Sequence, residues 1–485
     1  MEIQYCSLAE IQPRIKVRKI NNFEKVTNGD YMSLSSKEST SASVRDGWNF
    51  EAPAYEGGIL AANLYDAGTG LKRDNGCADL ERSYMMSVSN TSKNEFNAYT
   101  AKLLSCGYVL DSENSMDAPR YSELARQTNL YRLFRKDGKV LYTYFNAAID
   151  QVRIIEDPVS VPESGFEYVF GYNVNTPVEV YMYGMKYHPQ GLQFCDVGGD
   201  PDTANNGSFF IIKQADNSVI LIDGGAQRQA TGAAVEGLWE FLHQITEKDE
   251  GEPITVACWF VSHPHEDHYS LVHALIDQYH SQLDLQRVMF NFPNPEQIGF
   301  EIYDFRGKIE EYYSNVKFLK PHAGQSIQMG SVLIDVLATH EDLVSAITGK
   351  TLMTEGNSMS TILRFTMPDG TSFLNLGDFT KEAQEVLEDV LSASEWRCEI
   401  LAVAHHGYNM ITKTYESSDA NYALWPNYRP DEFTEWHLEV TTAVKERLIN
   451  NVGIPESNIY YAGNNTVKLE CQNGEVTVSL FDPVY

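Results

Sequence analysis

The chain has 485 residues, of which 43% are hydrophobic and 21% are charged, a composition typical of a globular protein with ample apolar material for a large core. Asp and Glu together number 67 against 37 Lys and Arg, so the formal net charge is -30. This surplus argues against a general nucleic-acid-binding protein, because neutralising phosphates requires a basic surface.

The cysteines and the hydropathy pattern bear on where the protein resides. The seven cysteines are scattered, odd in number, and never form a Cys-x-x-Cys pair. This spacing argues against a disulfide framework or a zinc ribbon and is typical of reduced cytosolic thiols. No window approaches ~18 uninterrupted apolar residues, and the chain does not open with a basic segment followed by an apolar one. We therefore expect a cytoplasmic protein that does not associate with membranes.

The first third of the chain predicts a small α+β module. Residues 92–106 carry apolar side chains at helical spacing after a Ser-Asn-Thr-Ser start signal. In residues 129–145, two runs typical of β-strands flank a Lys-Asp-Gly-Lys turn, which predicts a hairpin. Residues 151–155 predict a third strand. His, Cys and acidic residues do not cluster in this part, so we assign no chemistry to it.

A turn-rich stretch at residues 157–165 and a change of rhythm after it divide the chain. The sequence predicts two domains: residues 1–175, an accessory domain of unknown role, and residues 176–485. In the second part hydrophobic strands alternate with helices, which implies a sheet-rich α/β core with helices on its outer faces. Strands are expected over residues 178–183, 207–213, 219–222, 254–261, 332–337, 360–365, 372–376 and 398–404, and helices over 230–247, 269–281, 380–392 and 439–450.

One segment carries the strongest chemical signal. Residues 262–269, Ser-His-Pro-His-Glu-Asp-His-Tyr, directly follow the apolar strand 254–261. Three imidazoles and a carboxylate within six residues form a dense set of metal ligands. Pro264 favours an extended backbone, in which His263 and His265 point the same way and can share one metal ion.

Two further ligands in this segment, Asp267 and His268, lie where the chain turns into the following helix. At that turn they can face a second ion. Neutral imidazole and carboxylate suit Zn²⁺ best, and Mn²⁺ or Fe would also be acceptable.

This pattern, His-x-His-x-Asp-His after a hydrophobic strand, resembles the signature of the metallo-β-lactamase fold hydrolases. Further motifs occur in the expected order: Leu-Ile-Asp-Gly-Gly at 221–225, Leu-Gly-Asp at 376–378 and Ala-His-His-Gly at 404–407. Residues 194–198 and the Asn-Ser pair at 357–358 also resemble the soluble hydrolase domain of DNA-uptake competence proteins. The resemblance covers roughly residues 190 to 480 and implies an αββα sandwich preceded by a smaller α+β domain.

The resemblance implies a centre of two divalent metal ions. It implies that His263 and His265 bind the first ion. It implies that Asp267 and His268 bind the second, and that Asp378 bridges both.

Two ligand positions have two candidates each. The first ion is expected to take a third histidine from a later loop, and we favour His340 over His322 because it follows a strand and a glycine turn, as in the family. For the last ligand we favour His405 over His406, because it stands nearer the end of its strand. His406 would then contact substrate.

The implied activity is hydrolysis by a hydroxide that the two metals share. Asp267 and Asp378 are expected to be catalytic, the first by orienting the hydroxide or accepting its proton and the second by bridging the ions. Asp223 is expected to brace the ligand loop by hydrogen bonds without touching metal. Besides His406, the expected substrate contacts are Tyr269, Asn357, Ser358 and Asn409.

The substrate class follows from the resemblance and the charge. Similarity to the competence-protein domain favours a phosphodiester, and the charge of -30 favours a small-molecule or nucleotide-type substrate over a long nucleic acid. Ester, lactam or thioester hydrolysis is the alternative within the fold. A non-catalytic metal-binding scaffold or sensor is the alternative outside enzymes, and the presence of every expected ligand type argues against it.

Overall fold

A computed structural model describes most of the chain. The chain divides into two compact units, Met1–Ser41 and Ala42–Tyr485, and every described residue belongs to the second unit. The motif expected at 194–198 and the turn-rich stretch after residue 157 lie outside the described residues. The described residues are 48, 50–68, 83–119, 127–157, 175–184, 207–226, 230, 232–249, 251–294, 305–427, 429–430, 435–463 and 465–481.

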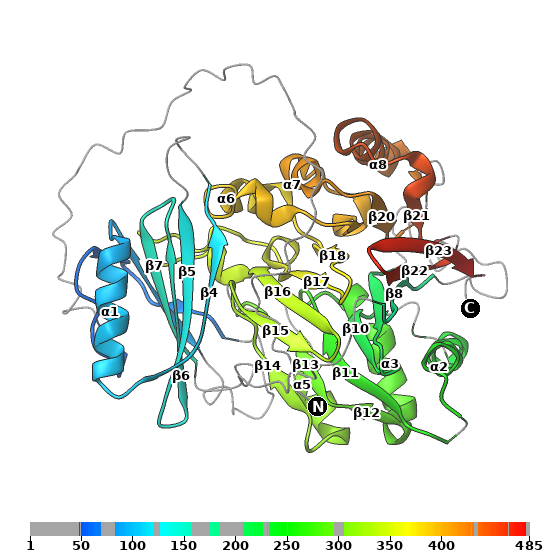
Figure 1. The fold of residues 1–485 in the computed structure, drawn as a ribbon, viewed down its shortest axis with the longest axis horizontal. Helices are drawn as coiled ribbons and strands as arrows, with labels where there is room; N and C mark the ends of the chain where they lie inside the picture. Colours follow the sequence, from blue (N-terminus) through cyan, green and yellow to red (C-terminus); the bar gives the residue numbers. More distant parts are fainter. Residues whose placement is uncertain are drawn as a thin grey trace, which may run out of the picture. The chain divides into compact units, whose positions relative to one another are not determined.

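The first sheet is antiparallel and is covered on one face by helix α1 (Lys93–Ser105) (Figure 1). The helix begins after Ser92, whose hydroxyl accepts a hydrogen bond from Glu95 N at 3.3 Å. The predicted helix, hairpin and third strand are all present. The strand order is β1 (Ile59–Leu60), β3 (Tyr84–Ser89), β7 (Gln151–Asp157), β6 (Lys139–Asn146), β5 (Thr128–Lys136) and β4 (Val109–Asp117), with β2 (Tyr65–Asp66) paired to β3.

The second sheet contains the strand that precedes the histidine segment. Its strand order is β14 (Lys317–Leu319), β13 (Arg287–Met289), β11 (Ile254–Phe260), β10 (Val219–Asp223), β9 (Phe209–Lys213), β8 (Val178–Met182), β22 (Thr466–Gln472) and β23 (Glu475–Phe481), and β12 (Leu283–Leu285) also pairs with β11. Strands β10, β11, β13 and β14 are parallel, so their carboxyl ends meet at one edge of the sheet.

The third sheet faces the second. Its strand order is β15 (Ser326–Met329), β16 (Val332–Ala338), β17 (Ile362–Thr366), β18 (Ser372–Asn375), β19 (Ile400–Ala402), β20 (Tyr422–Trp425) and β21 (Ile459–Tyr461). Pairing is antiparallel from β15 to β18 and parallel from β18 to β21. Asp378 and the histidine pair at 405–406 follow β18 and β19, which are neighbours and run the same way.

The core is layered, and strand β10 shows why. All its residues are buried, and alternate side chains point to opposite faces of the sheet. Val219 and Leu221 pack with helices α2 (Gly232–Thr246) and α3 (Ser270–Tyr279). Ile220 and Ile222 pack with the third sheet.

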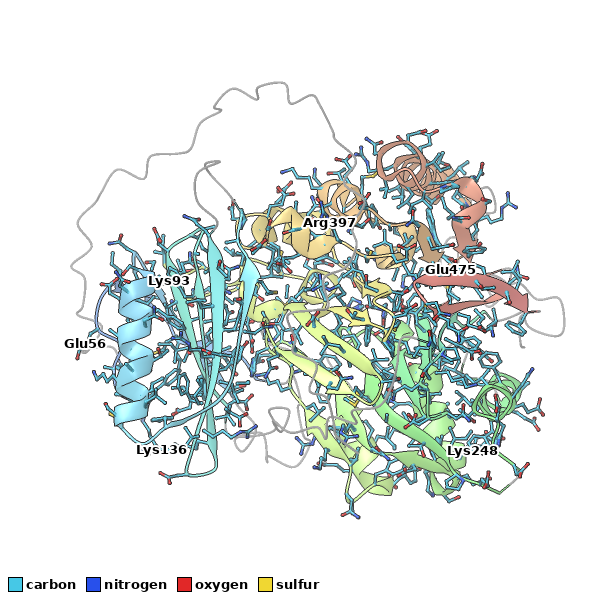
Figure 2. All side chains as sticks on the ribbon, in the orientation of Figure 1. Glu56, Lys93, Lys136, Lys248, Arg397 and Glu475 are labelled. Atoms are coloured by element: carbon cyan, nitrogen blue, oxygen red, sulfur yellow. The ribbon has the colours of Figure 1, made fainter. Side chains whose placement is uncertain are left out.

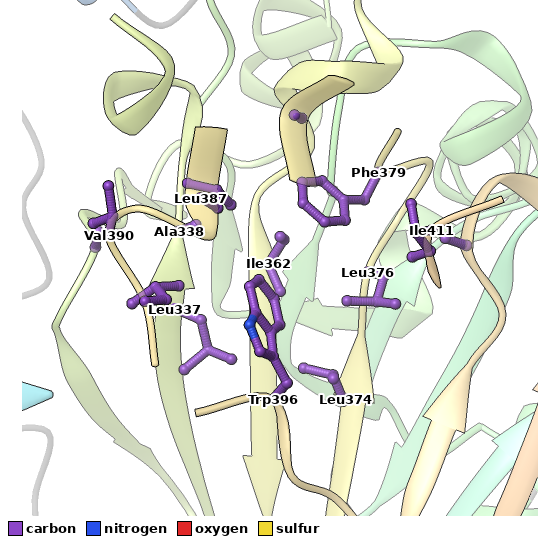
Figure 3. Packing of buried hydrophobic residues seen from close by; sticks show 14 of the residues in the cluster. Leu337, Ala338, Ile362, Leu374, Leu376, Phe379, Leu387, Val390, Trp396 and Ile411 are labelled. Carbon is purple, nitrogen blue, oxygen red and sulfur yellow. The ribbon is translucent and has the colours of Figure 1, made fainter. Parts of the chain in front are cut away.

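The outer face of the third sheet is covered in the same way. Figure 3 shows Ile362 and Leu374 on that face, packed with Phe379, Leu387 and other apolar side chains. Helices α6 (Lys381–Leu387), α7 (Thr412–Ser418) and α8 (Glu435–Arg447) contribute to the same layer. Helix, sheet, sheet and helix therefore follow one another, which confirms the predicted αββα sandwich.

The first sheet packs against this sandwich rather than standing apart from it. Tyr131 and Tyr144, from β5 and β6, belong to the same buried cluster as Leu337 and Leu343 of the third sheet and its following turn. The division of the chain at residue 175 stays a prediction.

Many charged side chains lie on the outside of these layers. Figure 2 labels Glu56, Lys93, Arg397 and Glu475, all of them exposed. Among the helices that the structure describes, none combines the length and the apolar composition needed to cross a membrane.

Candidate metal centre

The histidine segment lies at the carboxyl edge of the second sheet, directly after β11, and is held there by Asp223 at the end of β10. The Asp223 carboxylate accepts a hydrogen bond from Ser262 N at 2.8 Å and lies 2.9 Å from His268 Nδ1. Its backbone carbonyl accepts a hydrogen bond from Trp259 Nε1 at 2.9 Å. Asp223 therefore joins the beginning and the end of the segment that carries the ligands.

Asp378 brings two groups of ligand atoms together. Within each group all the ligand atoms lie within 4.8 Å of one another. Asp378 belongs to both groups, so its carboxylate lies between them. The first group is His263, His265 and Asp378, and the second is Asp267, His268, Asp378 and His406.

The two oxygens of Asp378 face different groups. Oδ1 lies 3.1 Å from His268 Nε2 and 3.5 Å from His406 Nε2. Oδ2 lies 3.8 Å from His263 Nε2. Asp267 Oδ2 lies 3.3 Å from His406 Nε2 and closes the second group. One oxygen toward each group is the arrangement that a carboxylate needs to bridge two cations.

The last position differs from our expectation, because His406 rather than His405 enters the second group. Both residues have positive φ, 48° for His405 and 51° for His406, and Gly407 follows at 85°. This left-handed run turns the chain sharply at the strand end. His406 is 1% exposed, and its Nδ1 lies 3.1 Å from the Pro426 carbonyl, which leaves Nε2 toward the carboxylates.

His405 lies beside the first group instead. Its Nε2 is 3.8 Å from Asp378 Oδ2, the same oxygen that faces His263. It is also 3.2 Å from the side-chain amide nitrogen of Asn357. The side chain is 24% exposed, so it also borders the open side of the centre.

His340 and His322, the two candidates for a third ligand of the first ion, lie outside both groups. His340 is held by Tyr65 of the first sheet, whose hydroxyl is 2.8 Å from Nδ1, and by Asn291 Oδ1, 2.9 Å from Nε2. His322 Nδ1 lies 2.8 Å from Glu341 Oε2. His340 follows strand β16, and for that reason we expected it to be a metal ligand. In the structure its Nδ1 instead faces the hydroxyl of Tyr65, which belongs to the first sheet.

Unpartnered atoms test whether these residues suit metal ions. His268 Nε2 and His406 Nε2 are buried and form no hydrogen bond within the described structure. Asn357 Oδ1, beside His405, is also buried and also forms no hydrogen bond within the described structure. Leaving a buried polar atom without a partner costs free energy, and a coordinated cation removes that cost. Imidazole nitrogens and carboxylate oxygens are the donors that Zn²⁺ and similar cations take, so the residues fit a pair of divalent ions.

Carboxylates and imidazoles in the two groups stabilise each other's charges. Burial by itself would lower the pKa of His406, but the carboxylates of Asp378 and Asp267 raise it to about 9. Burial likewise opposes the charge on His268, yet Asp378 and Asp223 raise its pKa well above the usual value. The histidines in turn hold the pKa of Asp378 well below its ordinary value against the effect of burial. A cation that binds here therefore displaces protons from imidazoles.

The expected substrate contacts separate into two kinds. Tyr269 is 5% exposed and packs behind the ligand segment, with its ring centroid 5.1 Å from that of His273 and 5.3 Å from that of Phe305. It therefore belongs to the core under α3 and not to the open side. Asn357 reaches His405, as described above, and Asn409 lines a cavity.

This cavity has a volume of about 400 Å³ and is lined in part by Glu355 and Ser358, which flank the loop whose Asn357 reaches His405. It contains two carboxylates that the sequence analysis did not single out, Glu355 and Glu382, and the only signal for them was their place beside the Asn-Ser and Gly-Asp motifs. Another cavity, of about 460 Å³, lies among residues 283–287 and 312–317 and contains none of the ligands. The lining of the first cavity is formed by residues 352–355, Ser358, Thr380, Glu382 and Asn409.

Comparisons with known proteins find likeness in structure alone. The sequence matches no described protein family and no curated protein. The chain is similar to the metallo-β-lactamase fold protein YhfI from Bacillus subtilis, with 11% identity over 51% of this chain and 85% of that one and a TM-score of 0.29. It is also similar to CmlA, a diiron β-hydroxylase from Streptomyces venezuelae, with 11% identity over 72% of this chain and 73% of that one and a TM-score of 0.30.

Proposed function

We propose that the protein is a hydrolase that depends on two divalent metal ions. The observation that carries this proposal is the position of Asp378, with one oxygen toward His263 and the other toward His268 and His406. A carboxylate shared between two sets of imidazole and carboxylate ligands is what a two-metal hydrolytic site requires.

In this proposal the ligands divide between two ions. The first ion is held by His263, His265 and Asp378, with His405 placed beside the same Asp378 oxygen to complete the set. The second ion takes the remaining group. Its ligands are Asp267, His268, His406 and Asp378.

When bound, two such ions would lower the pKa of a water molecule and stabilise negative charge on the substrate oxygen. The protein prepares the ligands for this task through their second ring nitrogen. His268 Nδ1 faces the carboxylate of Asp223, and His406 Nδ1 faces the carbonyl of Pro426. Each contact favours a proton on Nδ1 and leaves the Nε2 lone pair for a cation.

Asp267 and Asp378 have distinct tasks in this scheme. Asp378 holds the two halves of the centre at a common carboxylate. Asp267 lies 3.3 Å from His406 and is 23% exposed, so one of its oxygens can orient a water molecule or accept its proton from the open side.

We propose a phosphodiester as the substrate, with a small-molecule or nucleotide-type structure. The support is the resemblance of the ordered motifs to the competence-protein hydrolase domain, together with a net charge of -30 that disfavours long polyanions. Zinc as the metal and a cytoplasmic location complete the proposal. Ester, lactam or thioester hydrolysis is the second candidate, because the same two-metal site also polarises a carbonyl.

The first test is the metal content of protein purified without added metal, measured by plasma mass spectrometry. We expect about two ions per chain, because each ligand group suits one divalent cation. Asp378→Asn should lose most of this metal. The matched control is Glu385→Gln, an exposed carboxylate on α6 outside both groups, which should keep it.

Activity separates the substrate classes once metal is shown. Bis(p-nitrophenyl) phosphate and p-nitrophenyl acetate release the same chromophore and report phosphodiester and ester hydrolysis side by side. Hydrolysis of the first that is lost in Asp378→Asn supports the phosphodiester proposal. If the wild-type protein binds no metal, even after Zn²⁺ or Mn²⁺ is added, the hydrolase proposal is wrong.

A further inference from the structure

We propose that Gly356 is a positioning residue for the first metal ion, because its backbone, bare of a side chain, keeps the ring of His265 turned toward the first ligand group. This inference rests on the proposed function, since it concerns a ligand of the same centre. It assigns to residue 356 a need for the absence of a side chain, and it makes the first ion more sensitive to this position than the second.

The backbone conformation of Gly356 does not explain why a glycine stands there. Its φ of -65° and ψ of -37° are ordinary α-helical values, which residues with side chains adopt without strain. A glycine in such a conformation makes the folded state less stable than an alanine would, because the unfolded chain has more conformational freedom to lose. The surroundings of Gly356 supply the reason instead.

The space beside Gly356 is occupied by the ring of His265. A Cβ atom added at Gly356 would lie 2.8 Å from Nε2 of that ring, 3.3 Å from Cε1 and 3.4 Å from Cδ2. The first of these distances is too short for a carbon atom beside a ring nitrogen, so one of the two partners would have to shift.

The turn that begins with this glycine is anchored by buried hydroxyl groups. The hydroxyl of Ser360 donates a hydrogen bond to the Asn357 carbonyl at 2.9 Å and accepts one from Asp378 N at 3.0 Å. The hydroxyl oxygens of Ser358 and Thr380 lie 2.7 Å apart, and both residues are buried. A retreat of the turn would break these contacts and leave buried polar groups without partners, so the backbone resists displacement.

The ring of His265 yields more readily than the turn. His265 is only partly buried, whereas His263 is completely buried. Nδ1 of His265 lies 3.0 Å from His263 Nε2 and so faces the first group, while Nε2, on another edge of the ring, faces residue 356. Rotation about the side-chain bonds of His265 moves the ring without moving the backbone. A methyl group against Nε2 would therefore turn Nδ1 away from the first ion.

The test measures the two Zn²⁺ dissociation constants of the full-length protein by competition with a chelator. His265→Ala identifies the constant of the first ion, because His265 belongs to the first group and not to the second. In Gly356→Ala the same constant should rise by about 10- to 100-fold, as when a residue that orients a ligand is lost, and the other by less than about threefold.

The matched control is Gly232→Ala, at the first residue of α2. Gly232 also lacks a positive φ, and no atom lies within 4 Å of an added Cβ, so the same substitution meets open space. This variant should keep both constants. After removal of metal, both alanine variants should show a urea midpoint equal to or above that of the wild-type protein, because alanine suits both backbones.

A double variant shows whether the methyl group acts through the imidazole. In Gly356→Ala/His265→Ala the ring is absent, so the constants should equal those of His265→Ala alone. A further weakening in the double variant would mean that the methyl group disturbs the centre by another route, and it would overturn the inference.

The remaining outcomes separate this inference from the proposed function. If the wild-type protein binds two ions and Gly356→Ala binds both with unchanged constants, the positioning role is wrong while the two-metal proposal stands. Equal weakening of both ions, or a lowered urea midpoint of metal-free Gly356→Ala, would indicate a general disturbance of the fold and would also overturn the positioning role. If the wild-type protein binds neither Zn²⁺ nor Mn²⁺, both proposals are wrong.

Discussion

The histidine pair at residues 405 and 406 owes its arrangement to three consecutive residues in the left-handed region. Such a conformation costs a non-glycine residue of order 1–3 kcal/mol and persists only where the surroundings impose it. Here Trp425 imposes it: its indole nitrogen donates a hydrogen bond to the His406 carbonyl at 2.8 Å, and its ring lies against Gly407. The contacts of Trp425 therefore account both for the strained backbone at residues 405–407 and for the position of the His406 side chain.

A methyl group at Gly407 tests this origin. Its Cβ would lie 2.0 Å from the Trp425 ring, at a φ of 85°. We expect Gly407→Ala to lower the free energy of unfolding by about 2–4 kcal/mol and to reduce metal content by about half, through loss of His406 from the second group. Urea denaturation and metal analysis measure the two effects.

The matched control is Gly453→Ala. Gly453 has a φ of 90° and no atom within 4 Å of an added Cβ, so it carries the backbone cost without the clash. It should lose about 1 kcal/mol and keep its metal. Equal losses in the two variants would show that Trp425 does not position the histidine pair.

At the scale of elements, strand β7 of the first sheet is tied to the turn after β16 by one arginine. Arg153 is 2% exposed and donates hydrogen bonds to the backbone carbonyls of Asp342, at 3.0 Å, and Val344, at 3.1 Å. It also donates to the carbonyl of Glu341. The planar guanidinium can satisfy several carbonyls at once, which a lysine cannot do.

We expect Arg153→Lys to lower the free energy of unfolding by about 3–5 kcal/mol, because buried carbonyls and the Asp342 carboxylate lose their partner. The midpoint of urea denaturation measures this loss. Arg135→Lys on β5, in the same sheet, is the control, since Arg135 is 34% exposed and pairs with Asp111, and its loss should stay below about 1 kcal/mol. Similar losses at both positions would argue against a role for Arg153 in joining the two elements.

The same junction contains a buried group of charges on Lys320, His322 and Glu341. Glu341 Oε1 lies 3.6 Å from Lys320 Nζ, and Oε2 lies 2.8 Å from His322 Nδ1. Burial opposes the charge on Glu341, but these neighbours hold its pKa well below the usual value of 4.5. Its contribution to stability is therefore present above about pH 4.5 and is lost as the pH falls toward its folded-state pKa.

Glu341→Gln should make this visible in melting temperatures measured from pH 3 to pH 8. At neutral pH the variant should be less stable by about 3–5 kcal/mol, because Lys320 and His322 lose the buried carboxylate that lies between them. Below about pH 4.5 the gap to the wild-type protein should narrow. Glu113→Gln, at an exposed surface pair, should follow the wild-type curve, and a gap that stays constant in acid would contradict the assignment.

At the scale of the whole molecule, the first sheet and the sandwich bury side chains in a common cluster. Tyr131, Tyr142 and Tyr144 of the first sheet lie there with Leu337 and Trp396 of the sandwich. His340 completes this junction through the hydroxyl of Tyr65. The first sheet therefore covers an apolar surface that the sandwich would otherwise expose to water.

We expect a chain that starts at residue 176 to be insoluble, or to melt well below the intact protein, since a large apolar patch would face solvent. A chain that starts at residue 42 retains all the described contacts and is the control. Expression in the soluble fraction and melting temperature measure the outcome. Equal stability of both chains would show that the sandwich does not need the first sheet.

The sequence by itself determined the parts of this protein that depend on local spacing. Strands β8–β11 and β16–β19 and helices α2, α3, α6 and α8 of the sandwich follow from hydrophobic periodicity, and the grouping of His263 with His265 follows from the two-residue repeat of an extended chain. Asp378 was identified from a short motif at a strand end. In each case the information lies within a few residues, because backbone geometry alone sets the direction of the side chains.

Only the tertiary structure decided the positions that depend on distant segments. His406 enters the second group because Trp425 and Gly407 impose a left-handed turn, and spacing from the strand end could not reveal it. His340 lies outside both ligand groups, and its Nδ1 lies 2.8 Å from the hydroxyl of Tyr65, which is 275 residues earlier. Packing between segments far apart in sequence supplies these partners, and no local pattern records it.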